Sequence, residues 1–227
     1  KTSDQYWVCH IKGLSHLNLR DYDNAISEFK KSLNILPESA NGYLSLGICF
    51  HKKQEFENAE SYYISASLKK DNYVEAFFNL ANLYKDFGYA EKSEKYVSIA
   101  LKINPNLPQI YNIKGTLSEM KNDLKSAVKH YLKAISLNQS YHEPIFNLSL
   151  IYLFLNQFKE GWKFYEKRWH NEAYLNKKMN TDRPYWSPGV SKNHKVTIWP
   201  EQGIGDFILM SRFLNDLKNA TNHITLL

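Results

Sequence analysis

The chain has 227 residues, of which 43% are hydrophobic and 23% are charged, and its net charge is +6. This composition is typical of a globular protein and excludes an intrinsically disordered chain. The basic residues are spread along the chain rather than gathered in one run, so we expect no nucleic-acid partner.

Cysteine, histidine and apolar residues exclude three further classes of protein. The two cysteines, Cys9 and Cys49, cannot form a disulfide framework, which predicts a reducing, cytoplasmic location. The histidines have no metal-ligand spacing, so we expect no metal site. No stretch reaches the ~18 consecutive apolar residues that a membrane span needs. The first residues have neither an initiator methionine nor an apolar signal core, and we expect the chain to begin inside a longer protein.

Small residues recur every 34 positions through most of the chain. One column holds Ala25, Ala59, Ser93, Ala127 and Gly161, and another holds Gly13, Gly47, Ala81, Gly115 and Ser149. Four residues after each member of the first column comes a bulky side chain, in order Phe29, Tyr63, Val97, Tyr131 and Tyr165. Two antiparallel helices approach closely where one presents a small side chain. The pattern therefore predicts helix hairpins that stack into a solenoid, with the bulky groups filling the space towards the next unit.

The repeat resembles the tetratricopeptide repeat (TPR) family. The run from Asp21 through Pro37, which begins DYDNAI, matches the family's second helix. Five units keep one register over residues 6–175 and start at Tyr6, Ala40, Val74, Pro108 and His142. The resemblance implies an all-α TPR superhelix of antiparallel helix hairpins over residues 1–170, with a protein or peptide ligand in its concave groove.

A few positions depart from the family pattern. Lys12 and Lys114 stand where leucine is preferred, and Cys9 stands where a large aromatic residue is usual. Val97 replaces the ring of the second helix in the third unit. We therefore expect a thinner contact between the third and fourth units.

By family analogy, defined positions of each first helix face the groove. Among them are Lys52, Asn79, Asn82, Lys85, Asn112 and Asn147. Asparagine amides both donate and accept, so they can hold a peptide backbone, and lysine adds a contact to an anion. The alternative is a polar surface that only meets water. In the fifth unit the groove positions Leu150, Leu153 and Phe154 are apolar, and we expect the following domain rather than a partner to cover them.

The repeat ends after Phe158. Residues 171–194 lose the helical period and contain RPYWSPG, which predicts a linker. The segment KVTIW at 195–199 predicts a strand, residues 206–218 an amphipathic helix, and HITLL at 223–227 a second strand. Strand, helix and strand form a βαβ unit, so residues 195–227 predict an incomplete α/β, Rossmann-like segment with parallel strands.

A glycine turn, PEQGIGD at 200–206, precedes the predicted helix. Gly203 and Gly205 let the backbone approach a phosphate or sugar, although tight turns also use glycine for structural reasons alone. The segments GW…YE.RW, P.W.PG and EQGIGD resemble a bacterial group of TPR-coupled glycosyltransferase-like proteins, similar to the heptosyltransferase branch of the two-lobed GT-B fold. The resemblance implies that Asp206 is the base that activates the acceptor hydroxyl. The alternative role of Asp206 is to cap the helix N-terminus.

These resemblances lead to two functional hypotheses. The first is a protein- or peptide-binding scaffold that recognises the acceptor for a glycosyltransferase-like protein. The second is a nucleotide-sugar-dependent glycosyltransferase when the chain is full length, and a scaffold with a degenerate transferase domain is a third reading. The GT-B fold needs two lobes, and this truncated chain stops in the second strand of the first lobe. We therefore expect residues 1–227 to bind no cofactor and to lack transferase activity.

Overall fold

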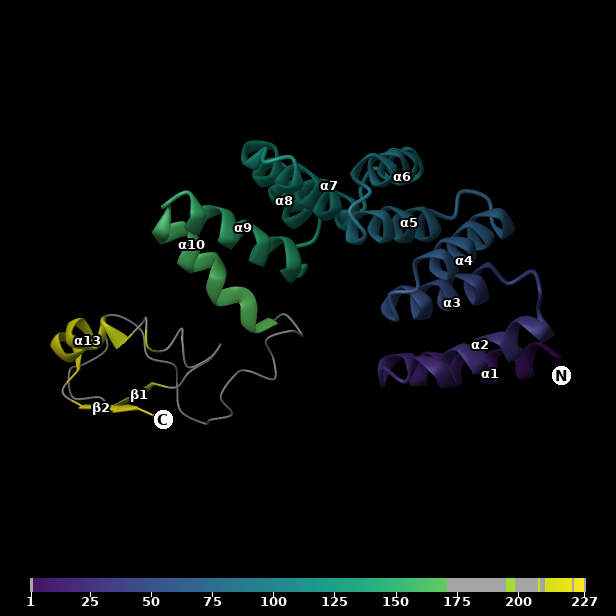
Figure 1. Cartoon of the computed structure of the whole chain (residues 1–227), viewed down its shortest axis with the longest axis horizontal. Helices are drawn as coiled ribbons and strands as arrows, with labels where there is room; N and C mark the ends of the chain where they lie inside the picture. The colour runs from purple at the N-terminus through teal and green to yellow at the C-terminus, as the bar shows by residue number, and fades with distance from the viewer. Residues whose placement is uncertain (1, 171–194, 199–207, 209–210, 222, 227) are drawn as a thin grey trace. The chain divides into compact units, whose positions relative to one another are not determined.

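A computed structural model describes residues 2–170, 195–198, 208, 211–221 and 223–226 (Figure 1). The chain divides into two compact units, residues 1–165 and residues 166–227, and each is described by itself. Within the described residues, every helix is too short or too polar to cross a bilayer.

The first unit consists of helices joined by short turns. In chain order they are α1 (Thr2–Asn18), α2 (Tyr22–Ile35), α3 (Ala40–Lys52), α4 (Phe56–Lys69), α5 (Val74–Asp86), α6 (Ala90–Ile103), α7 (Pro108–Met120), α8 (Leu124–Leu137), α9 (His142–Phe154) and α10 (Phe158–Tyr165). Consecutive helices pack as hairpins, from α1 with α2 to α9 with α10, and each hairpin packs on the next (Figure 1). The unit is thus the array of repeated helix hairpins that the small-residue columns predict.

The small and bulky columns meet inside each hairpin. A Cβ added to Gly47 would lie 2.4 Å from the ring of Tyr63, and a Cβ added to Gly115 would lie 2.3 Å from the ring of Tyr131. The ring therefore sits directly on the glycine of its own hairpin. Each ring also packs in one apolar cluster with residues of the next hairpin, Tyr63 with Leu80 and Leu83 and Tyr131 with Leu148 and Ile151, so it fills the space towards the next unit as predicted. Ala25, Ala59 and Ala127 are fully buried, as close helix packing requires.

The third hairpin solves the same packing problem with different side chains. Ala81 replaces glycine and Val97 replaces the ring, so a larger residue in one helix faces a smaller residue in the other. The hydroxyl of Ser93 donates to the carbonyl of Ala81 at 2.7 Å and joins the two helices. The contact between α6 and α7 is smaller than that between any other consecutive hairpins of the array, as expected from Val97.

Every hairpin turn contains one residue with positive φ at the same position of the repeat. These residues are Arg20, Gln54, Gly88, Asn122 and Asn156, with φ between 58° and 82°. Two backbone hydrogen bonds close each turn. In the first turn, the N–H of Arg20 donates to Leu17 and the N–H of Asp21 donates to His16. This is the Schellman arrangement at a helix C-terminus, repeated with the period of the array.

The second unit contains η1 (Glu166–His170), β1 (Lys195–Ile198), α13 (Leu214–Ala220) and β2 (His223–Leu226) among its described residues. Strands β1 and β2 pair in parallel, with Lys195 opposite His223 and Ile198 opposite Leu226. This agrees with the parallel strands that the βαβ pattern predicts. The predicted linker, residues 171–194, lies outside the described residues.

The predicted helix over residues 206–218 is interrupted. Ile208 and Ser211 are helical, but Arg212 and Phe213 form a turn before α13 begins at Leu214. The hydroxyl of Ser211 donates to the carbonyl of Ile208 at 2.6 Å. Such a local side-chain bond competes with the helical backbone bonds, which gives a physical reason for the break.

Candidate functional site

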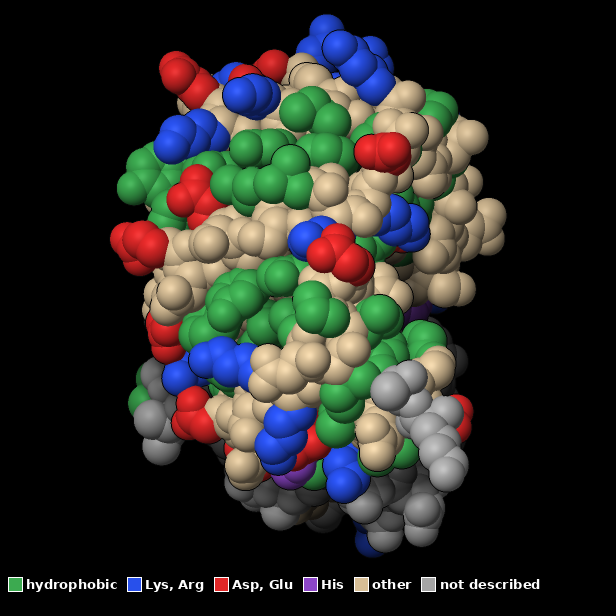
Figure 2. Space-filling view, turned by 90° about the vertical axis from the view of Figure 1, so that its right-hand side faces the viewer, with side chains coloured by type: hydrophobic (Ala, Val, Ile, Leu, Met, Phe, Trp, Pro, Cys, Tyr) green, Lys and Arg blue, Asp and Glu red, His purple; other side chains and the backbone are tan. Residues whose placement is uncertain are grey.

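The first helices of the hairpins line one side of the array. Helix α3 contacts both α1 and α5, and α7 contacts both α5 and α9. Residues that are 34 positions apart therefore stand side by side on neighbouring helices. On the face of the molecule shown in Figure 2, hydrophobic side chains lie in separate patches with charged side chains between them.

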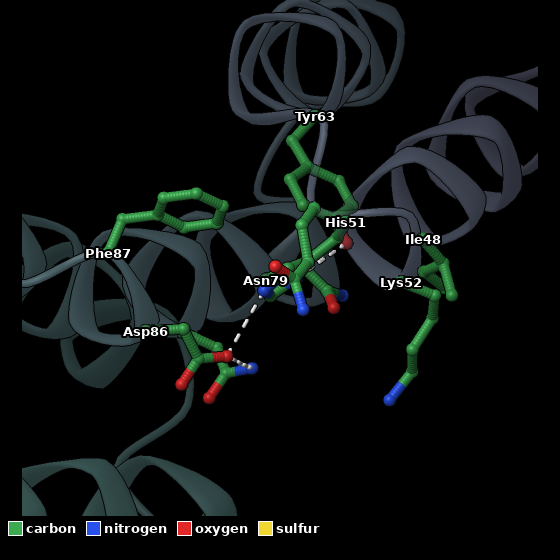
Figure 3. Close-up of a pocket in the computed structure, with 9 residues that line it drawn as sticks. Ile48, His51, Lys52, Tyr63, Asn79, Asp86 and Phe87 are labelled. Carbon is green, nitrogen blue, oxygen red and sulfur yellow. Dashed lines mark hydrogen bonds and ion pairs between the residues drawn. The ribbon is translucent and has the colours of Figure 1, made fainter.

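A pocket of about 620 Å³ lies on α3 and α5 (Figure 3). Its lining residues are Ile48, His51, Lys52, Gln54, Tyr63, Asn79, Asn82, Asp86 and Phe87. Three of the predicted groove residues, Lys52, Asn79 and Asn82, are thus brought to one pocket. Ile48 and Phe87 add apolar wall to it.

Asp86 is the centre of a polar network in this pocket. Its carboxylate accepts from Asn82 Nδ2 at 3.2 Å and lies 3.1 Å from His51 Nε2, so it joins α3 to α5 (Figure 3). Lys85 Nζ forms an ion pair with the other oxygen of Asp86 at 3.0 Å. Burial alone would raise the pKa of Asp86, but His51 and Lys85 hold that pKa below its ordinary value. The carboxylate is therefore anionic at neutral pH, and it neutralises Lys85.

Tyr63 fixes His51 from the opposite side. The Tyr63 hydroxyl lies 3.4 Å from His51 Nδ1, and the two rings meet edge to face with centroids 6.2 Å apart. Tyr63 is fully buried because its ring packs on Gly47, and burial raises its pKa. The neutral phenol and Asp86 together engage both ring nitrogens of His51. This part of the pocket is therefore held in one arrangement before any ligand binds.

Lys52 and Asn79 keep polar groups available for a ligand. In the part of the chain that the structure describes, no carboxylate pairs with Lys52, which is exposed and lies apart from Asp86 in the view of Figure 3. Asn79 donates one N–H to the carbonyl of Glu75 at 2.7 Å. Its amide oxygen and second N–H remain, so the lining of the pocket includes both a cation and an amide.

Asn112 and Asn147 lie elsewhere, on α7 and α9. Asn147 Nδ2 donates to Asn112 Oδ1 at 3.4 Å, and Asn112 is only 3% exposed. The nearby hydroxyls of Thr116 and Tyr131 are 3.2 Å apart. Asn112 therefore belongs to a buried polar contact between the fourth and fifth hairpins, whereas the sequence analysis set it in the open groove.

The remaining predicted residues are of two kinds. In the fifth hairpin Leu150 is exposed and Phe154 is 75% exposed; that the following domain covers them stays a prediction. Gly203, Gly205 and Asp206 lie outside the described residues. The repeat register also assigns His51 and Asp86 to groove positions of their helices, but it did not predict that the two side chains pair. Their spacing carries no sign of pairing, because they lie on different hairpins.

Comparison with known proteins identifies the repeat. The model of the tetratricopeptide repeat matches residues 8–38, 74–107 and 108–141. Protein O-mannosyl-transferase TMTC3 of Mus musculus is 23% identical over 155 residues, which cover 62% of this chain and 17% of that protein. Protein FlbA of Caulobacter vibrioides is 20% identical over an alignment of 248 positions, gaps included, which covers 93% of this chain and 42% of that protein. The chain thus spans less than half the length of either curated relative.

Solved structures share the fold. The crystal structure of TTC0263, a thermophilic TPR protein of Thermus thermophilus, has a TM-score of 0.65 and 17% sequence identity. The similarity covers 74% of this chain and 92% of that chain. At this identity the likeness establishes the helical-repeat fold and leaves ligand and activity open.

Proposed function

We propose that the tetratricopeptide repeats of this chain form a protein-binding module whose pocket on α3 and α5 holds an acidic stretch of a partner polypeptide. The TPR fold makes the array a protein-interaction scaffold. The observation that carries the finer proposal is that exposed Lys52, which has no ion pair among the described residues, lines the same pocket as the amides of Asn79 and Asn82. An ammonium supplies a contact to a carboxylate, and the amides supply contacts to the peptide backbone.

The fixed network around Asp86 distinguishes this pocket from a polar surface that only meets water. His51, Asn82 and Lys85 are already bonded to Asp86, so their side-chain entropy is lost on folding rather than on binding. Preorganisation of this kind lowers the cost of binding. Lys85, which the sequence analysis put in contact with an anionic ligand, instead supports the pocket by pairing with Asp86.

Peptides selected from a random library on residues 1–227 would test the pocket. We expect Lys52→Ala and Asn79→Ala each to weaken the selected peptides by about tenfold, the order of a lost charged hydrogen bond. Leu68→Ala, which removes an exposed side chain of α4, is the matched control and should leave affinity unchanged. Calorimetry measures the affinities, and circular dichroism verifies that each variant is folded. Equal affinities for the wild type and all three variants would mean that the pocket is only a polar surface in contact with water.

We further propose that the full-length protein is a glycosyltransferase in which the array selects the acceptor polypeptide. Two observations support this proposal: the parallel pairing of β1 and β2 around α13, and a relative named as a protein O-mannosyl-transferase. In this proposal Gly203 and Gly205 approach the phosphate or sugar, Asp206 accepts the proton of the acceptor hydroxyl, and a nucleotide sugar is the donor.

Two substitutions of Asp206 in the full-length protein separate catalysis from helix capping. Asparagine caps a helix as well as aspartate does but cannot act as the base, whereas alanine can do neither. We expect Asp206→Asn to abolish sugar transfer to polypeptide, measured by intact-protein mass spectrometry with nucleotide-sugar donors, and to leave the melting temperature unchanged. If Asp206→Asn keeps full activity and only Asp206→Ala melts earlier, Asp206 is a cap and the proposed base is wrong.

A further inference from the structure

Helix α1 carries an exposed apolar stripe. Trp7, Ile11 and Leu14 are 50%, 57% and 40% exposed. Their spacing of four and three residues places them on one face of the helix. Burying side chains of this size is strongly favourable, so three of them grouped together and exposed are unusual on the surface of a small domain.

The repeat register places this stripe on the same side of the array as the pocket. Leu14 corresponds to Ile48 of α3 and to Asn82 of α5, and both of these residues line the pocket. Ile11 likewise corresponds to Asn79 two units on, another lining residue. Because α1 packs beside α3, the stripe continues the groove from the wall formed by Ile48.

The exposed stripe is not on the face of α1 that corresponds to the packing face of the other hairpins. In α5 the residues Ala76, Leu80 and Leu83 are fully buried, and they belong to apolar clusters with the residues of the preceding hairpin. The equivalent residues of α1 are Val8, Lys12 and Ser15. Two of these three are polar, so α1 presents polar groups where other hairpins pack and apolar groups where the groove runs.

Trp7 is held in place by neighbouring rings. Its indole meets Tyr6 edge to face at 5.0 Å between centroids, and it meets His10 in the same way at 6.0 Å. Tyr6 is anchored in turn by a 2.6 Å hydrogen bond between its hydroxyl and Ser39 Oγ. An indole that is half exposed and already ordered is the kind of side chain that dominates protein–protein binding energies.

The charges along this end of the groove define the ligand. The groove positions of α1 and α3 contain no carboxylate; they are Trp7, His10, Ile11, Leu14, Leu17 and Asn18 on α1 and Asn41, Leu44, Ser45, Ile48, His51 and Lys52 on α3. Carboxylates begin at Glu75 and Asp86 on α5, and Asp86 is already paired. The groove positions of α1 and α3 thus combine an apolar surface with one lysine, Lys52, which has no ion pair among the described residues.

We propose that the α1 stripe and the pocket form one site for an extended segment of a partner protein, with an aromatic or aliphatic side chain on the stripe and an acidic side chain at Lys52. This inference rests on the proposed binding function and adds the nature of the ligand. It excludes a purely acidic ligand, since the stripe would then stay uncovered.

Helix geometry sets the spacing of these two ligand side chains. Packed helices lie about 10 Å apart, which separates α1 from α3. Lys52 lies one turn beyond Ile48, which is level with Leu14, and this adds about 6 Å along the helix. The diagonal from Lys52 is about 12 Å to the level of Leu14 and about 19 Å to the level of Trp7, which an extended chain spans in about four to six residues at about 3.4 Å each.

Peptide selection on residues 1–227 tests the inference directly. We expect the selected peptides to be enriched in an aromatic or aliphatic residue about four to six positions from an acidic residue. Trp7→Ala and Ile11→Ala should each weaken the labelled peptides about tenfold, and fluorescence anisotropy measures the change. Leu68→Ala removes a more exposed aliphatic side chain outside the groove and should have no effect. Replacing the apolar residue of the peptide should abolish the difference between wild type and Trp7→Ala.

The outcomes separate this inference from the function on which it rests. If Lys52→Ala weakens binding while Trp7→Ala and Ile11→Ala do not, the pocket binds peptide and the stripe has no part in it. If no variant alters binding, the proposed function is wrong as well. If no peptide is enriched and the chain instead binds phosphatidylcholine vesicles in a way that Trp7→Ala abolishes, the stripe is a membrane-contacting surface and the inference is overturned.

Discussion

Close contact between one glycine and one ring is the basic packing unit of the array. The Tyr63 ring occupies the space that a Cβ on Gly47 would need, at 2.4 Å. In the third hairpin the same two positions hold Ala81 and Val97. The chain therefore contains two solutions to one packing problem, with the total side-chain volume shared differently between the two helices.

This comparison predicts an overpacked variant and its rescue. Gly47→Ala forces the Tyr63 ring to move and should lower the free energy of unfolding by about 1–3 kcal/mol. Adding Tyr63→Val recreates the pair found in the third hairpin and should recover part of that loss. Urea denaturation of both single variants and the double variant gives the coupling between the two sites. Losses that simply add in the double variant would mean that the two positions pack independently.

His10 gives the first hairpin a pH dependence. It is buried against Tyr6, Trp7 and Phe29, which carry no charge, and burial lowers its pKa. The folded protein therefore keeps His10 neutral at pH values at which the unfolded chain already binds a proton. The contribution of His10 to stability is complete above the unfolded pKa of about 6.5 and is lost as the pH falls below it.

Chemical denaturation at several pH values tests this dependence. Each pH unit through which only the unfolded chain protonates His10 costs about 1.4 kcal/mol. We expect the wild type to lose more stability than His10→Phe between about pH 6.5 and pH 5. Because the phenylalanine ring does not titrate, the difference between the two slopes isolates His10 from the other histidines. Parallel slopes would show that His10 is protonated equally in the folded and unfolded chain.

At the scale of elements, the hairpin turns share one backbone conformation but differ in sequence. Each turn needs a residue with positive φ, and glycine occupies that position only at Gly88 among the turns of the array. Arg20 has a backbone φ of 61°, which residues other than glycine and asparagine rarely adopt. The fold therefore tolerates some backbone strain at the first turn.

Substitutions at two turns should have opposite effects. Arg20→Gly relieves the strain and should raise the free energy of unfolding by about 0.5–1 kcal/mol. Gly88→Ala puts a Cβ on a residue at φ 82° and should lower it by about 1 kcal/mol, although no atom lies within 4 Å of that Cβ. Thermal melts monitored by circular dichroism measure both shifts. Stabilisation by Gly88→Ala would show that the turn is not held at positive φ in solution.

At the scale of the whole molecule, the helical unit behaves as a chain of neighbours. Each hairpin packs on the next, and the weakest junction is the one between α6 and α7. In such arrays stability depends on each repeat and on the interfaces it shares. Loss of stability in one hairpin should therefore extend further on the side where its contact with the next hairpin is larger.

Tyr131→Ala tests how far damage spreads. It removes a fully buried ring from the fourth hairpin and should cost about 3 kcal/mol or more. Hydrogen exchange followed by mass spectrometry should show faster exchange in α7 to α10, whereas α1 to α4 keep their protection because the α6–α7 contact is small. Uniformly faster exchange in every helix from α1 to α10 would instead indicate that the array unfolds as one cooperative unit.

The candidate site could be predicted only in part from the sequence. Groove positions were assigned by repeat register, and that register brings Lys52, Asn79 and Asn82 to one pocket. The roles of Lys85 and Asn112 were not predictable in this way. Lys85 is neutralised by Asp86, and Asn112 is buried by its contact with α9. Charge pairing and burial depend on residues from other helices, and a single helix pattern does not contain that information.

By itself the sequence determined the repeated hairpins, because side-chain size at a fixed period is a local property of the chain, and the order strand, helix, strand predicted the parallel strand pair. It also predicted the thin junction after α6 from the single residue Val97. Only the tertiary structure decided which groove residues remain open to a ligand. His51 and Asp86 are 35 positions apart, and the stacking of two hairpins brings His51 Nε2 to 3.1 Å from the Asp86 carboxylate. Among the described residues that line the pocket, Lys52 is then the lysine without an ion pair. The openness of the pocket is thus a property of the packed array.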